Sequence, residues 1–213
     1  MMIRYSLTNR DVALLEALTL RVRCLSRAQI ARTWWEDSAA GQANANARLK
    51  VLARAGLITP FLALAHPEIP LHAPLYVWQP GQANPDFGAA AYRLQVRWQH
   101  AAVATPCVLA TRAAGHRWGG HGGRFPRQSE QTHDLHVSAL FLHYREKHPE
   151  WVPYWVSEER LREEKAAGEK LPDALLRLPT GDYIIEWGGI YSKPKLQAFH
   201  AHCVEQQCGY EMW

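Results

Sequence analysis

Prolines divide this chain into two parts. Five of them fall within twenty residues, at positions 67, 70, 74, 80 and 85. Proline fixes φ and has no backbone N–H, so this stretch cannot hold a long helix or a central strand. We therefore place a domain boundary here and expect a first domain over residues 1–80, a linker over 81–127 and a second domain over 128–213.

Length and composition are those of an ordinary globular protein. The 213 residues suffice for two small domains, and 47% hydrophobic with 21% charged residues excludes a disordered or fibrous chain. Arg4, Arg10 and Asp11 lie where a signal peptide needs an apolar core, and no apolar run approaches the ~20 residues of a membrane span. We therefore expect a cytoplasmic protein with no membrane partner.

The cysteines and the net charge narrow the chemistry further. The cysteines are scattered without a CxxC pair, which predicts reduced thiols rather than a disulfide framework or a four-cysteine zinc site. They are Cys24, Cys107, Cys203 and Cys208. The formal net charge of +4 agrees with a nucleic-acid partner.

The first domain begins with two capped helices. Thr8 is placed to cap a helix over residues 8–23, in which apolar residues recur at helical spacing. Ser26 and Gln29 match a capping box, in which each side chain satisfies an orphan amide at a helix start. This box predicts a second, short helix with Ile30 turned inward.

A third helix follows a polar break at residues 36–44. In the segment 45–58, Leu49 and Leu52 line one side and Gly56 stands near the C-terminal end. The apolar stretches LITPFLAL and PLYVWQPG can then form a β-ribbon. Three short helices and a β-ribbon are typical of a winged helix-turn-helix, which binds DNA.

In such a domain the third helix enters the major groove. Its N-terminal half offers amide and cationic side chains, which can pair with base edges or phosphates. The expected DNA-binding residues of this helix are Gln42, Asn44, Asn46, Arg48 and Lys50. A plain three-helix bundle is the alternative, and many related folds bind protein instead.

The expected linker carries a glycine-rich basic segment, GHRWGGHGGRF. Its backbone amides beside Arg117 and Arg124 could surround a phosphate, which adds these two arginines to the expected DNA-binding residues. The alternative, which we favour, is a mobile surface loop. A helix over AAAYRLQVRWQHAAVA and a strand over PCVLATR are also expected in this region.

Two groups of histidines and cysteines are candidate zinc ligands. They are His133, His136 and His143 on an amphipathic helix, THDLHVSALFLHYREKH, and His200, His202, Cys203 and Cys208 near the C-terminus. Neither group has a standard zinc spacing, so a structural role is expected for both.

The second domain carries two carboxylates on neighbouring strands. WVPYWVSEERLREEK predicts a strand running into a charged helix, and LPDALLRLPTGDYIIEWGGIY predicts a β-hairpin around a Thr-Gly-Asp turn. Asp173 begins this hairpin and Glu186 ends it, so the two carboxylates project toward one spot. Such a pair can hold Mg²⁺, which polarises a phosphate and activates water for phosphodiester cleavage.

These residues resemble the PD-(D/E)xK nuclease superfamily, whose signature is a Pro-Asp, a strand-borne Glu or Asp, and a lysine two residues further on. Pro172, Asp173 and Glu186 match this signature, whereas Gly188 occupies the place of the lysine. In the superfamily that lysine orients the attacking water and steadies the charge of the transition state. Its absence here predicts an inactive domain.

The same resemblance offers substitutes for the missing lysine. Lys193 or Lys195, at the head of the following helix, could reach its position, and Glu158 or Glu159 would correspond to the acidic residue of the first core helix. If the domain is active, the implied catalytic residues are Asp173, Glu186 and Lys195, with Asp173 and Glu186 as the Mg²⁺ ligands.

The order of the whole chain resembles the replication-relaxation family of plasmids and integrative conjugative elements. It runs from the helix-turn-helix through the histidine-bearing helix to LPDALL, IIEWGG and the terminal Tyr210, Glu211 and Trp213. The resemblance implies an α+β or α/β protein, in which a winged helix-turn-helix precedes a restriction-endonuclease-like domain with a central mixed sheet. It also implies an accessory protein of mobile-element replication, transfer or regulation that binds double-stranded DNA, and such regulators are commonly homodimers.

Three functions follow from these observations. A DNA-binding protein without catalysis or a required cofactor is the first. A magnesium-dependent DNA endonuclease is the second, and Gly188 argues against it. A protein–protein adaptor in a transfer or defence complex is the third, because the net charge is small and the chain has nine tryptophans.

Overall fold

The computed structural model describes residues 6–164, 166 and 170–213. The protein is mixed α+β with two sheets, one antiparallel and one mixed. It forms two compact units, and each is assembled from two separate stretches of the chain. Unit 1 comprises Met1–Glu68 and Ala102–Leu142, and unit 2 comprises Ile69–Ala101 and His143–Trp213.

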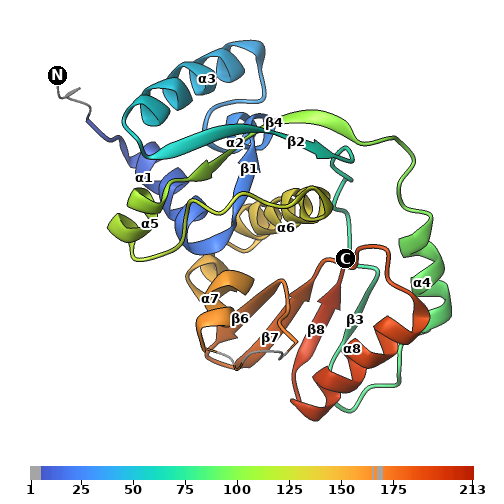
Figure 1. The fold of residues 1–213 in the computed structure, drawn as a ribbon. Coiled ribbons are helices and arrows are strands. Elements are labelled where there is room, and N and C mark those ends of the chain that lie inside the picture. The colour runs from blue at the N-terminus through green and yellow to red at the C-terminus, as the bar shows by residue number, and fades with distance from the viewer. Residues whose placement is uncertain (1–5, 165, 167–169) are drawn as a thin grey trace. The chain divides into compact units, whose positions relative to one another are not determined.

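Unit 1 combines short helices with a three-stranded sheet (Figure 1). Its elements are α1 (Asn9–Glu16), the π-helical turn η1 (Ala17–Arg21), β1 (Cys24–Ser26), α2 (Arg27–Trp34), α3 (Ala39–Arg54), β2 (Ile58–Ala65), β4 (Val103–Ala110) and α5 (Arg112–Trp118). Helix α6 (Gln128–Lys147) begins in unit 1 and continues into unit 2.

The first two helices begin at their predicted caps. The Asp11 carboxylate accepts the Thr8 N–H at 2.7 Å, and Thr8 Oγ1 accepts the Asp11 N–H at 3.3 Å. Ser26 and Gln29 make the same reciprocal pair of bonds, at 2.9 and 3.1 Å. The cap at Thr8 and the capping box at Ser26 are therefore confirmed, and a cap of this kind contributes about 1 kcal/mol to stability.

Helix α3 begins earlier than predicted. Most of the expected polar break at 36–44 is helical, because Ser38 caps the helix by accepting the Gly41 N–H at 3.0 Å. The alanines that follow, from Ala39 on, have the highest helix propensity. At the other end Gly56 takes a left-handed φ of 71°, as expected for a glycine that ends a helix.

The strand after α3 pairs differently from the prediction. β2 pairs along its whole length with β4, and the antiparallel sheet has the order β1-β4-β2. The segment PLYVWQPG, expected to pair with LITPFLAL, instead forms β3 (Tyr76–Trp78), which pairs with β8 (Gly209–Met212) in unit 2. Strand β4 matches β2 in length with eight residues, whereas β3 has only three. The predicted β2–β3 ribbon is therefore wrong.

Unit 2 is built on a five-stranded mixed sheet of order β3-β8-β7-β6-β5. Its further elements are α4 (Phe87–Gln95), the 3-10 helix η2 (Pro149–Tyr154), β5 (Trp155–Ser157), α7 (Glu158–Glu164), β6 (Ala174–Leu178), β7 (Gly181–Glu186) and α8 (Lys193–Glu205). Strands β5, β6 and β7 form an antiparallel meander, and β8 pairs parallel to β7 after the crossover through α8. The predicted hairpin is confirmed, and so is the helix that follows it with Lys193 and Lys195 at its start.

Helices α4 and α8 pack together on this sheet, and they lie side by side in Figure 1. Their contact with the strands forms a core that includes Leu94, Leu196 and Tyr210. Trp155 and Trp187 are also fully buried.

The segment 81–127, expected as a linker, is divided between the two units. Helix α4 packs in unit 2, whereas β4 is the central strand of the unit 1 sheet. The chain therefore does not divide into the three consecutive segments that we predicted. Each unit instead joins two stretches that are distant in sequence, because strands from both stretches pair in one sheet. Within the described ranges, no helix is long and apolar enough to span a membrane.

Candidate nucleic-acid interface and acidic site

Helices α2 and α3 are joined by a tight turn at residues 35–38. Gly41, in the first turn of α3, makes this approach possible, because a Cβ there would lie 2.2 Å from the Glu36 carbonyl oxygen. Such a contact is far inside van der Waals distance, and its partner is backbone that cannot move aside. Gly41 thus allows α3 to start directly after the short turn that follows α2.

The polar residues predicted to bind DNA do not share one environment on α3. Gln42, Asn44 and Lys50 are exposed. Asn46 and Arg48 are half-buried, and the Asn46 side-chain oxygen accepts no hydrogen bond from the described residues.

Arg48 holds α3 against α1 instead of facing solvent. Its Nε and Nη2 donate to the Asp11 carboxylate at 2.9 and 2.6 Å, and Nη2 also donates to the Ser6 carbonyl at 2.6 Å. Asp11 is fully buried and also caps α1 through Thr8. Burial alone would raise the pKa of Asp11, but the bonds from Arg48 and Thr8 outweigh it and lower the pKa below its usual value. The fork of Arg48 is therefore already bound to a carboxylate.

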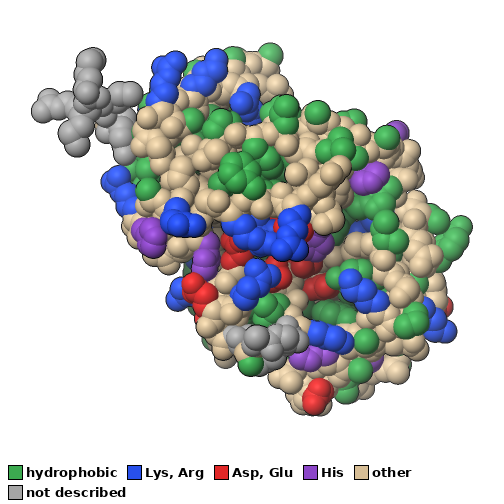
Figure 2. All heavy atoms as spheres, in the orientation of Figure 1, with side chains coloured by type: hydrophobic (Ala, Val, Ile, Leu, Met, Phe, Trp, Pro, Cys, Tyr) green, Lys and Arg blue, Asp and Glu red, His purple; other side chains and the backbone are tan. Residues whose placement is uncertain are grey.

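The exposed face of α3 carries positive charge. Ala43, Ala47, Lys50 and Arg54 recur at intervals of four, three and four residues, and all are exposed. This spacing places them in one stripe along the helix. Residues 39–57 contain no Asp or Glu. In Figure 2, side chains of Lys and Arg lie over α3, with none of Asp or Glu beside them on the described surface in view.

The glycine-rich segment does not form a free phosphate-binding loop. The His121 N–H donates to the Thr19 carbonyl at 2.7 Å, and the Gly123 N–H donates to the Ala110 carbonyl at 2.7 Å. A Cβ at Gly120 would lie 2.1 Å from the same Thr19 oxygen. These amides are used inside unit 1, so both the predicted phosphate site and the favoured mobile loop are replaced by a docked segment.

The two arginines of this region are also engaged. Arg124 pairs with Glu130 at 2.9 Å, and Arg117 lies 5.0 Å from the centroid of the Trp118 ring. Arg117 belongs to α5, and in Figure 1 α3 lies above β2 whereas α5 lies below it. These arginines do not extend the exposed stripe of α3.

Asp173 and Glu186 lie at the same end of the β6–β7 hairpin in unit 2, as predicted. The Asp173 N–H donates to Glu186 Oε2 at 3.1 Å, and the Trp187 N–H donates to Asp173 Oδ2 at 2.8 Å. Each carboxylate therefore accepts a hydrogen bond from a backbone N–H at the end of the neighbouring strand.

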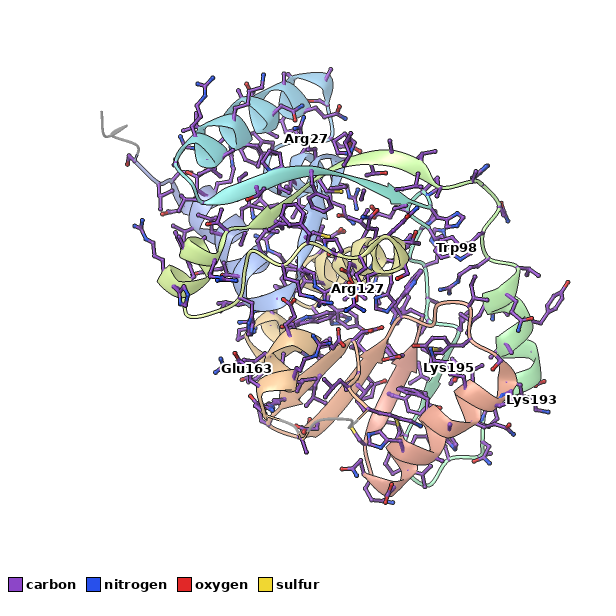
Figure 3. The ribbon with its side chains drawn as sticks, viewed as in Figure 1. Arg27, Trp98, Arg127, Glu163, Lys193 and Lys195 are labelled. Carbon is purple, nitrogen blue, oxygen red and sulfur yellow. The ribbon has the colours of Figure 1, made fainter. Side chains whose placement is uncertain are left out.

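A tyrosine connects Glu186 with Lys195. The Tyr191 hydroxyl donates to Glu186 Oε1 at 2.8 Å, and Lys195 Nζ lies 3.5 Å from the centroid of the Tyr191 ring. Burial raises the pKa of Tyr191, and the nearby charges of Glu186 and Asp173 raise it further. Lys193 and Lys195 both come from the first turn of α8 (Figure 3). The structure thus gathers Asp173, Glu186 and Lys195 around Tyr191.

The position of the missing lysine is filled by apolar side chains. A Cβ at Gly188 would lie 2.7 Å from Met212 Sδ and 3.0 Å from both Leu94 methyl carbons. Arg97, which follows α4, donates from Nη1 to the Gly188 carbonyl at 2.6 Å. Arg97 also lies 4.2 Å from the centroid of the Trp187 ring, and burial lowers the pKa of Arg97 to about 10.

Three of the four oxygens of this carboxylate pair already have protein donors. Both oxygens of Glu186 accept hydrogen bonds, and so does Oδ2 of Asp173. The described part of the chain contains no group of three or more His, Cys, Asp or Glu residues suited to hold a metal.

Two of the histidines predicted to be structural bond to protein atoms. His136 donates from Nδ1 to the Thr132 carbonyl at 2.7 Å, and His200 is buried between Tyr210 and Asn84. The neighbouring cysteines, Cys203 and Cys208, are both buried. No zinc site is found at either group among the residues that the structure describes.

Three residues that shape α3 and the Asp173–Glu186 pair were not predicted from the sequence. Asp11 stands three positions after Thr8, so a reciprocal cap could have been predicted, but its bond to Arg48 could not. Tyr191 and Leu94 carry no recognisable signal, because their roles depend on packing in unit 2.

No protein-family model, curated protein or solved structure matches this chain.

Proposed function

We propose that this protein binds double-stranded DNA through α3, with unit 1 acting as a winged helix-turn-helix. The observation that carries the proposal is the exposed stripe of α3, which presents alanines and cations on the second helix of a tight helix-turn-helix. The element order around it supports the same reading: β1 precedes α2, β2 follows α3, and β4 lies between them in an antiparallel sheet. The β2–β4 ribbon is then the wing, with unit 2 sequence inserted at its tip.

For unit 2 we propose a PD-(D/E)xK-like domain that has lost catalysis. Asp173 precedes β6 and Glu186 ends β7 in a mixed sheet, which agrees with the resemblance. Leu94 and Met212 fill the space beside Gly188, and the carboxylates serve as backbone acceptors. The proposed biological setting is the replication, transfer or regulation of a mobile genetic element, with the protein acting as a homodimer.

Binding of a fluorescent duplex over a salt series tests the DNA-binding proposal. Each phosphate neutralised by the protein contributes a slope of about −0.9 to the plot of log affinity against log salt. Exchange of Lys50 and Arg54 for alanine removes two cations and should weaken binding and reduce the slope by about 2. The matched control removes Arg93 and Lys147, two exposed cations of unit 2, and should leave affinity within twofold.

Two outcomes would overturn the proposal. One is an affinity that does not depend on salt, and the other is equal loss of binding in both double variants. The alternative of a magnesium-dependent endonuclease is tested separately with supercoiled plasmid and Mg²⁺ or Mn²⁺. Nicking that disappears in Asp173→Ala would establish that activity and refute the loss of catalysis.

A further inference from the structure

We infer that α3 recognises A·T base pairs in the major groove. This inference rests on the proposed DNA-binding function and specifies the class of duplex that the protein prefers. It follows from which side chains of α3 are left exposed once the helix-turn-helix is folded.

The first step concerns the arginine that could specify guanine. Arginine recognises G·C pairs by donating two parallel bonds from its fork to guanine O6 and N7. Arg48 is the only arginine of α3 before its last turn, and its Nε and Nη2 are both bound to Asp11. Asp11 is fully buried, so releasing Arg48 would leave a buried carboxylate without its cation. Arg48 is therefore withheld from the groove.

The second step concerns what remains exposed in the N-terminal half of α3, which is the part of a recognition helix that meets base edges. Gln42 and Asn44 are exposed amides on either side of Ala43. An amide side chain can accept from adenine N6 and donate to adenine N7 at the same time. No other base presents that pair of groups in the major groove.

The third step concerns the alanines. Ala43 and Ala47 are exposed on the central stripe, one turn apart. Their methyl groups can contact the C5 methyl of thymine, which cytosine lacks. Their small size also lets the helix backbone approach the bases closely. Lys50 and Arg54 continue the stripe toward the C-terminal end, where they would meet phosphates.

Selection of bound duplexes from a random library tests this inference, and the defined site it yields is then modified. Enriched sites should contain consecutive A·T pairs. Replacing adenine by 7-deazaadenine removes N7, and replacing thymine by uracil removes the methyl group. Each change within the contacted pairs should lower affinity, and loss of a bidentate adenine contact should cost roughly tenfold.

Variants connect the preference to α3. Asn44→Ala and Gln42→Ala should reduce the preference for A·T over G·C duplexes roughly tenfold while preserving salt-dependent binding. Gln197→Ala, an exposed amide of α8, is the matched control and should change nothing. All three side chains are exposed, so each variant should fold like the parent protein. Thermal melting of each variant verifies this.

The results separate this inference from the proposed function. A·T recognition by α3 would be refuted, while DNA binding stands, if binding depends on salt but the selected sites contain invariant G·C pairs. It would also be refuted if Asn44→Ala and Gln42→Ala leave the base preference unchanged. Absence of duplex binding at low salt would refute the proposed function and this inference with it.

Discussion

Replacing Arg48 by alanine should destabilise unit 1 without removing a DNA contact. The Asp11 carboxylate has no solvent-exposed surface and accepts bonds from Thr8 N, Thr8 Oγ1, Arg48 Nε and Arg48 Nη2 at 2.6 to 2.9 Å. Removing one partner of a buried ion pair costs about 3–5 kcal/mol. The Arg48 side chain is 25% exposed, so water can partly replace it, and we expect about 3 kcal/mol.

Urea titration at neutral pH measures this change as a lower midpoint with an unchanged slope. Lys50→Ala removes a neighbouring charge from the exposed side and should alter the free energy of unfolding by less than about 0.5 kcal/mol. Equal stability of Arg48→Ala and the parent protein would refute the reasoning.

The same pair predicts how acid acts on unit 1. The folded pKa of Asp11 is lowered, so its contribution is fully present above the unfolded value of about 3.9 and is lost as pH falls through the folded value. The Arg48→Ala variant should have lost this contribution already at neutral pH, so its stability should change less between pH 5 and pH 3.

Three further predictions concern other parts of the fold. Gly120→Ala should lower the free energy of unfolding by about 3 kcal/mol because its Cβ would meet backbone. Gly119→Ala, which has open space and a φ of 69°, should lower it by only about 1 kcal/mol. Equal costs in chemical denaturation would contradict the docked loop. Gln207, with a left-handed φ of 51°, should be improved by glycine by about 1 kcal/mol, and an unchanged or lower melting temperature would count against this. Burial lowers the pKa of His200, so the folded state binds fewer protons and stability should fall as pH drops below about 6.5; calorimetry from pH 7.5 to 5.5 should find a weaker pH dependence in His200→Gln, and an identical dependence would exclude this histidine as the cause.

Local chemistry made much of unit 1 predictable. The caps at Thr8 and Ser26 depend on residues three positions apart, so a short window of sequence specifies them. The end of α3 at Gly56 is equally local, because only the glycine conformation is needed. The start of α3 was misplaced because the polar residues at 36–44 concealed the cap at Ser38.

Long-range pairing explains what the sequence did not reveal. The partner of β2 lies beyond an insertion that belongs to unit 2, and nothing near residues 58–65 indicates this. Arg48 illustrates the same limit, because its polar side chain suggested a base contact while its partner Asp11 lies 37 residues away. In unit 2, the signature at Asp173 and Glu186 could be recognised from neighbouring residues in the sequence. The packing of Leu94 beside Gly188 could not, because Leu94 is distant in sequence.

Cross-linking from α3 tests the central claim most directly. All four native cysteines are buried, so a single Ala47→Cys substitution provides one accessible thiol for a short photoactivatable cross-linker. Irradiation with a bound duplex should give a covalent protein–DNA product from this position, and little from Ala198→Cys on the exposed side of α8. A product from Ala198→Cys with none from Ala47→Cys would contradict the assignment of α3 as the DNA-binding helix.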